Sequence, residues 1–166
     1  RDNVARKGAA YLRGMQDAGI IACAKHFPGH GDTDEDSHKV LPVIHHDRSR
    51  LDSIELYPFK ELIKQGLGAT MVAHLYVPTL DTLSNRATTL SPPVVNGLLK
   101  EELGFEGLVF SDALNMRQVS AFYNPGMVDV KALLAGNDVL LFVQDVPTAI
   151  IEIKKAINRG ELLRSD

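Results

Sequence analysis

The sequence predicts an α/β protein built from parallel strand–helix units. Apolar runs of strand length alternate with amphipathic stretches of helical spacing, and successive strands begin roughly thirty to fifty residues apart, as in parallel βα architecture. Polar residues suited to a site follow the strand ends. Four such units are half of a (β/α)8 barrel, so we expect residues 1–166 to be a single partial domain, the C-terminal half of a TIM barrel.

The first elements follow from apolar spacing and helix-ending residues. Apolar residues at helical spacing predict a helix over residues 3–18, closed by Gly19. The continuous apolar run at 20–25 predicts a strand buried on both faces. A helical stretch begins near residue 49, is kinked at Pro58, and ends at Gly66 or Gly68.

The second half repeats the pattern. Strands are expected at 69–73, 107–110 and 138–143, helices at 92–103, 128–135 and 147–157, and a loop at 78–90. Ser91 is expected to cap the helix that follows it, with Pro92 in its first turn. His74 and Asp112 come directly after strands, so we expect both at the same edge of the sheet.

Composition narrows the class of partner. The chain is 45% hydrophobic and 23% charged, with a net charge of −3. This balance offers no basic patch for nucleic acid, and the longest apolar runs are too short to span a membrane. The single cysteine, Cys23, lies in an apolar run and is expected to be a core residue. A small-molecule partner is therefore expected.

The segment from Lys25 to His38 has the composition of an active site. It holds three of the six histidines, four carboxylates and one lysine, and it follows an apolar strand. Titratable groups gathered on a loop at a strand end are typical of a catalytic or binding site.

Each candidate residue has a functional and a structural interpretation. Asp36 can orient the ring of His38 for proton transfer, or the two can be a turn residue and a surface residue. Lys25 and His26 can hydrogen-bond a polar ligand such as a sugar hydroxyl, or Lys25 can be held by a salt bridge. Asp112 can be a nucleophile, base or metal ligand, or the cap of the next helix.

The same loop raises the question of a metal. A calcium loop starting at Asp32 is excluded, because Ser37 and Val43 stand where glycine and a bidentate glutamate are needed. A zinc site remains an alternative, with a candidate ligand set of His26, His30, Asp32, Asp34 and His38.

Two motifs resemble glycoside hydrolase family 3, and specifically its bacterial β-N-acetylglucosaminidases. The first is Lys25-His26-Phe27-Pro28-Gly29-His30-Gly31-Asp32-Thr33, followed by Asp36-Ser37-His38 and Leu41-Pro42; the second is Phe110-Ser111-Asp112-Ala113-Leu114-Asn115-Met116. Both occur in the family's order, and Met71-Val72-Ala73-His74 between them also fits.

The resemblance implies a retaining hydrolase that releases terminal β-linked N-acetylglucosamine from peptidoglycan-derived sugars. By that resemblance Asp112 is the nucleophile, His38 held by Asp36 is the acid/base, and Lys25 and His26 bind the sugar, with His74 lining the same mouth. No metal or cofactor is implied, and the expected ligands are N-acetylglucosaminides and muropeptides. The compartment, bacterial cytoplasm or periplasm, stays undecided.

Further expectations concern this 166-residue chain itself. The family's barrel begins before Arg1, so we expect the chain alone to hydrolyse little and to self-associate through an open sheet edge. Two rival functions stay open, a non-catalytic sugar-binding module and a metal-dependent hydrolase.

Overall fold

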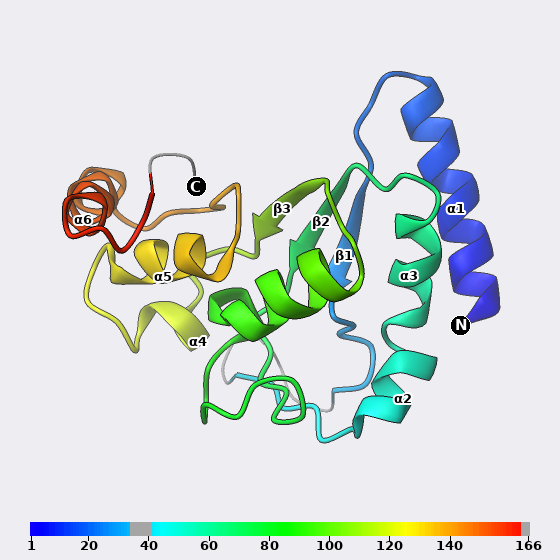
Figure 1. Cartoon of the computed structure of the whole chain (residues 1–166), viewed down its shortest axis with the longest axis horizontal. Helices are drawn as coiled ribbons and strands as arrows, with labels where there is room; N and C mark the ends of the chain where they lie inside the picture. Colours follow the sequence, from blue (N-terminus) through cyan, green and yellow to red (C-terminus); the bar gives the residue numbers. More distant parts are fainter. Residues whose placement is uncertain (34–40, 164–166) are drawn as a thin grey trace.

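A parallel sheet forms the centre of the molecule. The computed structural model describes residues 1–33 and 41–163. Within them, β1 (Cys23–Phe27), β2 (Ala69–Val72) and β3 (Leu108–Ser111) pair in parallel, in sequence order. Helices flank the sheet on both sides in Figure 1. The predicted α/β class with a parallel sheet is confirmed.

Helices lie in all five stretches where the apolar periodicity predicts them, but two short ones, at 88–90 inside the expected loop and at 117–120, were not predicted. The described residues form α1 (Asp2–Asp17), α2 (Arg48–Ser53), α3 (Tyr57–Ile63), η1 (Thr88–Leu90), η2 (Pro93–Glu102), α4 (Arg117–Ser120), α5 (Met127–Ala135) and α6 (Val146–Asn158). Pro58 separates α2 from α3 by standing in the first turn of α3. None of these helices combines the length and apolar character that crossing a bilayer requires.

The first strand begins later than expected. Residues 20–25 were predicted to be a strand buried on both faces, but Ile20 and Ile21 are 55% and 60% exposed. The amide of Ile20 still donates to the carbonyl of Met15, 3.0 Å away, after Gly19 turns the chain at φ +76°. This closing turn of α1 uses Ile20, so the ladder starts only at Cys23. Cys23 is itself exposed, so its predicted place in the core is wrong.

The prediction of a fourth strand at 138–143 is wrong. It is reduced to one bridge between Phe110 and Val139, so the described residues hold three strands, not four. The amide of Val109 donates to the Asp138 carboxylate at 2.7 Å, and the amide of Leu141 donates to the Ser111 hydroxyl at 2.9 Å. The amide of Ser111 donates to the carbonyl of Val139 at 2.9 Å, so a short backbone bridge and these side-chain bonds together hold this side of β3.

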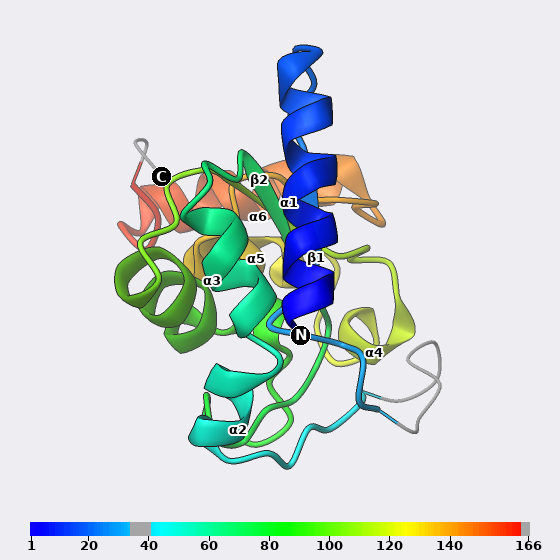
Figure 2. The ribbon, with the colours of Figure 1, turned by 90° about the vertical axis from the view of Figure 1, so that its right-hand side faces the viewer.

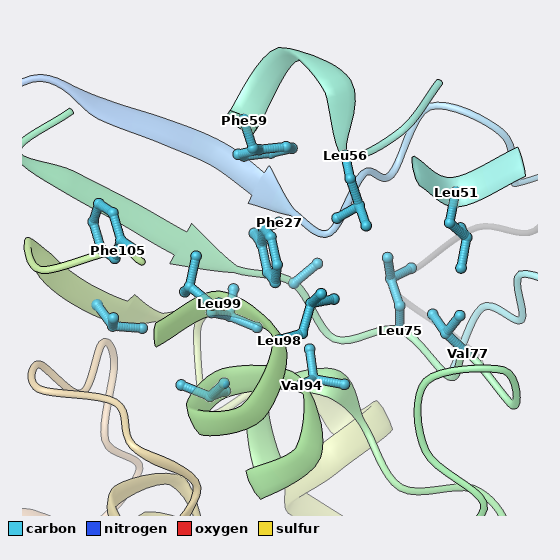
Figure 3. Packing of buried hydrophobic residues seen from close by; sticks show 14 of the residues in the cluster. Phe27, Leu51, Leu56, Phe59, Leu75, Val77, Val94, Leu98, Leu99 and Phe105 are labelled. Carbon is cyan, nitrogen blue, oxygen red and sulfur yellow. The ribbon is translucent and has the colours of Figure 1, made fainter. Parts of the chain in front are cut away.

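Apolar side chains from the helices and the sheet form one main core. Phe27 packs edge to face on Phe59, with ring centroids 5.2 Å apart, and η2 contributes Leu98 and Leu99 to the same cluster. Figure 3 shows Phe27 between α3 and η2. In Figure 2, α1 stands in front of the sheet, beside α3. This packing fixes the carboxyl ends of the strands, where the candidate residues lie.

Candidate active site

The three strand ends are joined to one another by backbone hydrogen bonds. The amide of Ala73 donates to the carbonyl of Phe27 at 2.9 Å, and the amide of Asp112 donates to the carbonyl of Val72 at 3.0 Å. Parallel pairing places these ends at one edge of the sheet. The loops that carry the predicted site residues therefore start from one rigid base.

Asp112 is half-buried and directly follows β3. Its Oδ1 atom accepts a hydrogen bond from the amide of Ala113 at 2.8 Å. The neighbouring Ser111 is fully buried and holds the amide of Leu141. One carboxylate oxygen is thus fixed, and within residues 1–33 and 41–163 no hydrogen bond holds the other, which can face a ligand.

Lys25 and His26 lie in β1, where Lys25 is exposed and His26 is half-buried. Burial lowers the pKa of His26, and although the Asp112 carboxylate favours the charged form, Lys25 and His30 add to the lowering. The ring of His26 is therefore neutral near pH 7 and offers one donor and one acceptor. A neutral ring close to a carboxylate suits hydrogen bonding to hydroxyl groups.

His74 lies behind Asp112 and is 2% exposed. Its Nε2 lies 3.0 Å from the carbonyl of Ala113, and its Nδ1 lies 2.8 Å from the hydroxyl of Thr89. Burial lowers its pKa, so the neutral ring donates from Nε2 to the carbonyl of Ala113, and Nδ1 faces the Thr89 hydroxyl, which also contacts the carbonyl of Ala73. His74 thereby holds Ala113, the residue whose amide binds the Asp112 carboxylate. Its predicted place in the sugar-binding mouth stays a prediction.

Two of the predicted catalytic residues, Asp36 and His38, lie outside the described residues, within 34–40. Of the other predicted site residues, the structure brings together His26, His74 and Asp112 at the ends of the three strands, and Lys25 lies on the first strand. His30 lies 6.2 Å from His26 between ring centroids, and its Nδ1 is 3.3 Å from the Thr33 hydroxyl.

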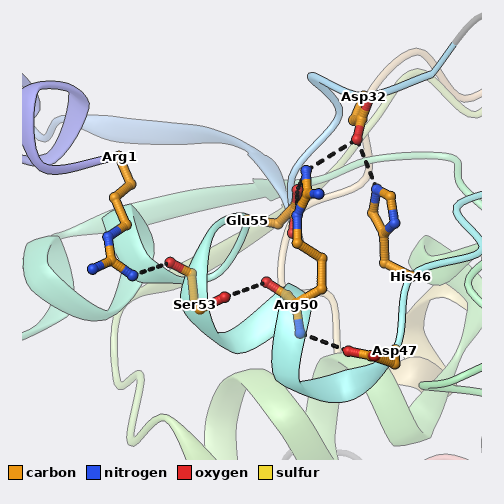
Figure 4. Close-up of polar contacts among 7 residues, drawn as sticks. All are labelled: Arg1, Asp32, His46, Asp47, Arg50, Ser53 and Glu55. Atoms are coloured by element: carbon orange, nitrogen blue, oxygen red, sulfur yellow. Dashed lines mark hydrogen bonds and ion pairs between the residues drawn. The ribbon is translucent and has the colours of Figure 1, made fainter.

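A polar cluster that the sequence analysis missed lies beside the loop. It consists of Asp32, His46, Arg50 and Glu55, and we call it the anchor cluster (Figure 4). His46, Arg50 and Glu55 lie in or next to a stretch whose apolar spacing predicts a helix and no site. The pairing of Arg50 with Glu55 five residues later was the one available hint.

The anchor cluster also bears on the zinc alternative. One ligand atom from each of Asp32, His46 and Glu55 lies within 4.8 Å of the others, and among the described residues neither His26 nor His30 joins this group. Arg50 already contacts Asp32 and Glu55, each at 3.1 Å. The guanidinium therefore supplies the positive charge that a cation would bring.

Comparisons with known proteins agree on one family. The family described as Glycosyl hydrolase family 3 N terminal domain matches residues 1–166. Beta-hexosaminidase A from Pseudoalteromonas piscicida is 38% identical over 148 residues, which cover 83% of this chain and 25% of that protein. A beta-hexosaminidase from Thiobacillus denitrificans is 40% identical over 136 residues, covering 81% of this chain and 36% of that protein.

Solved structures show the same fold. A glycoside hydrolase family 3 beta-N-acetylglucosaminidase from Paenibacillus sp. str. FPU-7 superposes with a TM-score of 0.92 at 43% identity, over 97% of this chain and 31% of that chain. The beta-N-acetylglucosaminidase from Thermotoga maritima superposes with a TM-score of 0.85 at 30% identity, over 97% of this chain and 35% of that chain. The chain thus spans well under half of these relatives, and it belongs to glycoside hydrolase family 3, whose N-terminal domain is TIM-barrel-like.

Proposed function

We propose that the natural protein containing this chain is a retaining β-N-acetylglucosaminidase. The observation that carries the proposal is the placement of Asp112 at the end of β3, hydrogen-bonded through its backbone to β2 and close enough to His26 to influence its charge. Membership of family 3 and relatives with beta-hexosaminidase and beta-N-acetylglucosaminidase names support the substrate class.

In the first step Asp112 attacks the anomeric carbon. The free oxygen of its carboxylate forms the new bond while the bond to the leaving oxygen breaks, and His38 gives that oxygen a proton. The hydrogen bond from the amide of Ala113 holds the other carboxylate oxygen, so the attacking atom is oriented before the sugar arrives. Positive charge that develops on the sugar lies against the carboxylate.

In the second step water replaces Asp112. His38, now unprotonated, takes a proton from water as the oxygen attacks the anomeric carbon and the bond to Asp112 breaks. Two inversions restore the original configuration. Asp36 orients the ring of His38, and a histidine in this role adds no second carboxylate beside the nucleophile. Lys25 and His26 on β1 contact the sugar in this proposal.

Steady-state assays of the full-length natural protein on aryl and disaccharide N-acetylglucosaminides test the mechanism. We expect Asp112→Ala to reduce turnover to background and His38→Ala to slow both steps by about 10² to 10⁴-fold. The loss in kcat/KM from His38→Ala should be smaller for an activated aryl leaving group, which needs no protonation. Equal losses on both substrates would remove the acid/base role of His38.

Trapping the covalent intermediate tests Asp112 directly. A fluorinated substrate analogue that slows the second step should leave a sugar attached to the peptide that contains Asp112, as detected by mass spectrometry. Attachment to another residue, or no attachment with an active enzyme, would overturn the assignment. Retained activity after chelation would further exclude the rival metal-dependent mechanism.

Two narrower points belong to the same proposal. We expect peptidoglycan-derived muropeptides to be among the substrates, and assays on purified muropeptides against simple aryl glycosides test this. We also expect the 166-residue chain by itself to be weakly active and to self-associate, because the apolar side chains of Ile20 and Ile21 beside β1 are exposed. A monomer by light scattering would contradict the second expectation.

A further inference from the structure

The anchor cluster joins both ends of the loop that carries the proposed acid/base residues. Asp32 belongs to the segment that leaves β1, and His46 belongs to the segment that leads into α2. The Asp32 carboxylate lies 2.7 Å from Nε2 of His46 and 3.1 Å from Nη2 of Arg50. Two chain segments fourteen residues apart in the sequence are therefore linked through one carboxylate oxygen.

Arg50 is itself held in place by α2. The Asp47 side chain accepts a hydrogen bond from the amide of Arg50 at 2.7 Å, which caps the start of the helix. The Ser53 hydroxyl donates to the carbonyl of Arg50 at 3.1 Å, and Arg1 donates to the carbonyl of Ser53 at 2.8 Å (Figure 4). The guanidinium thus projects from a fixed backbone.

Glu55 makes the cluster more than a surface ion pair. Its side chain is 6% exposed, and its Oε1 accepts from both Nε and Nη2 of Arg50, at 3.3 and 3.1 Å. Its Oε2 is buried without a hydrogen-bond partner among the described residues. A buried carboxylate is costly unless it is paired, so the contact with Arg50 contributes more than an exposed pair does.

Gly29, in the segment that leaves β1, lies directly against Glu55. Gly29 has φ +133°, and a Cβ atom there would come within 2.8 Å of the Glu55 Cβ. Only glycine fits this close approach. The segment that leads into α2 is fixed as well. The amide of Ile44 donates to the carbonyl of Tyr76 at 2.9 Å, and the amide of Tyr76 donates to the carbonyl of Pro42 at 2.8 Å.

We propose that Arg50 is a positioning residue for the reaction: by bridging Asp32 and Glu55 it fixes residues 29–33 and 41–46, between which Asp36 and His38 lie in the sequence. The inference rests on the proposed function, because it assigns Arg50 an effect on the acid/base step. Arg50 contacts neither Asp112 nor the strand residues Lys25 and His26 in the interactions described above, so its effect should fall on proton transfer and not on sugar binding.

Kinetics of the full-length natural protein test the proposal. Arg50→Ala should lower kcat on an N-acetylglucosamine disaccharide by about 10²-fold, the scale of loss expected from misplacing a reacting group, with KM little changed. The loss in kcat/KM should be smaller on an activated aryl glycoside. Arg50→Lys should restore part of the activity, since one ammonium group can pair with either carboxylate but lacks the planar fork.

Arg48→Ala is the matched control. Arg48 lies on the same helix, has a similar side-chain exposure of 40% against 43%, and pairs with Asp52 and Glu102 outside the anchor cluster. It should leave kcat within about twofold. Equal losses from Arg48→Ala and Arg50→Ala would show a general effect on α2 and would overturn the proposal.

A double-mutant cycle separates this inference from the proposed function. If Arg50 acts through His38, adding Arg50→Ala to His38→Ala should cause little further loss, whereas independent effects would multiply. Multiplied losses in an active enzyme would overturn the role of Arg50 and leave the proposed function standing. An inactive wild-type protein would instead overturn the proposed function.

Amide hydrogen exchange judges the anchoring without any assay of activity. Arg50→Ala and Asp32→Asn should each raise exchange at least tenfold at Ile44, whose amide donates to the carbonyl of Tyr76, and Arg48→Ala should not. Unchanged exchange would overturn the proposal. Calorimetric titration with zinc covers the remaining alternative: one equivalent bound by wild type and lost in Asp32→Asn would assign the cluster to a cation instead.

Discussion

Two regions differ in burial from what the polarity of their side chains suggests. One is the segment between β2 and η2, residues 73–91. The other is the stretch just before β1 that holds Ile20 and Ile21. The first contains four threonines and two serines, yet it holds the buried side chains of His74, Asp81, Thr88 and Thr89. The second is apolar in sequence, yet Ile20 and Ile21 are exposed. Burial follows from hydrogen-bond partners and neighbouring elements as much as from the polarity of a side chain.

Thr88 and Thr89 show how the polar segment becomes core. The Thr88 hydroxyl donates to the carbonyl of Ala73 at 2.6 Å and lies 3.2 Å from the amide of Leu75, so it serves as donor and acceptor at once. Asn137 donates to the carbonyl of Thr89 at 2.8 Å. These bonds attach the segment to the end of β2, which carries His74. The region that supports the site is therefore built from polar contacts.

The largest loss of stability in the polar segment 73–91 should come from Arg86→Met. Arg86 donates to both oxygens of Asp81, at 2.6 and 2.8 Å, and Asp81 is 4% exposed. Removing the arginine leaves the buried carboxylate without a countercharge, although Ser91 and the amide of Leu83 still donate to it, so we expect the free energy of unfolding to fall by about 3 kcal/mol. Urea unfolding measures this.

Arg159→Met is the control for that experiment, because Arg159 and Glu161 form a pair whose side chains are 47% and 45% exposed. Its unfolding midpoint should match the wild type. If both variants lose the same stability, the burial of Asp81 does not make its ion pair more important than an exposed one.

A smaller loss is expected from His74→Phe. The phenylalanine ring fills a similar volume but leaves the carbonyl of Ala113 and the hydroxyl of Thr89 without the histidine partner, which should cost about 2 kcal/mol. Asp112 follows the same backbone, so turnover should fall as well. A variant that is as stable as wild type would show that the buried ring acts only by filling space.

The pH dependence of stability sharpens the role of His74. Burial lowers its pKa in the folded state, so the unfolded chain binds more protons below the ordinary value of 6.5. Stability is therefore complete above pH 6.5 and is lost as the pH falls from there toward the folded pKa. We expect a slope of up to about 1.4 kcal/mol per pH unit.

His74→Phe should lose this contribution, so the difference in unfolding free energy between wild type and variant should shrink from pH 7 to pH 5.5. Taking the difference removes the contribution of His26, whose pKa burial lowers in the same direction. A difference that stays constant with pH would mean that His74 does not titrate differently on unfolding.

The smallest change in stability should come from the apolar stretch before β1. Ile21→Thr should change the free energy of unfolding by less than about 0.5 kcal/mol, because the side chain is already 60% exposed. Val72→Thr, at a fully buried position of β2, is the control and should be clearly destabilising. A large loss from Ile21→Thr would show that this surface is covered in solution.

Local signals predicted most of the fold. The spacing of apolar residues with Gly19, Pro58 and Gly136 located the helices, because these residues act on the backbone next to them. Strand limits depended on partners far away in the sequence. The run at 138–143 has strand composition, but it bridges β3 only at Val139. The side chains of Asp138 and Ser111 bind the amides of Val109 and Leu141 instead, and no local pattern reveals that.

The candidate site divides in the same way. Asp112, Lys25 and His26 were found because each stands at or near a strand end, which is a local feature of parallel folds. Arg50 and Glu55 were missed because their importance comes from a contact with Asp32, eighteen positions before Arg50. Ser91 was predicted to cap its helix, but its hydroxyl instead donates to Asp81 across the segment.

The Asp138 carboxylate has a consequence for assembly. This carboxylate and the backbone of Asp138 and Val139 bond to the amides of Val109 and Ser111 and to the carbonyl of Val109 on the free side of β3. On the other side of the sheet, no strand lies beyond β1 in the described part of the chain. A sheet that can extend at only one border cannot propagate into a fibre, since each added copy would need two receptive borders. Pairing between copies through strands would stop at a closed, two-fold dimer.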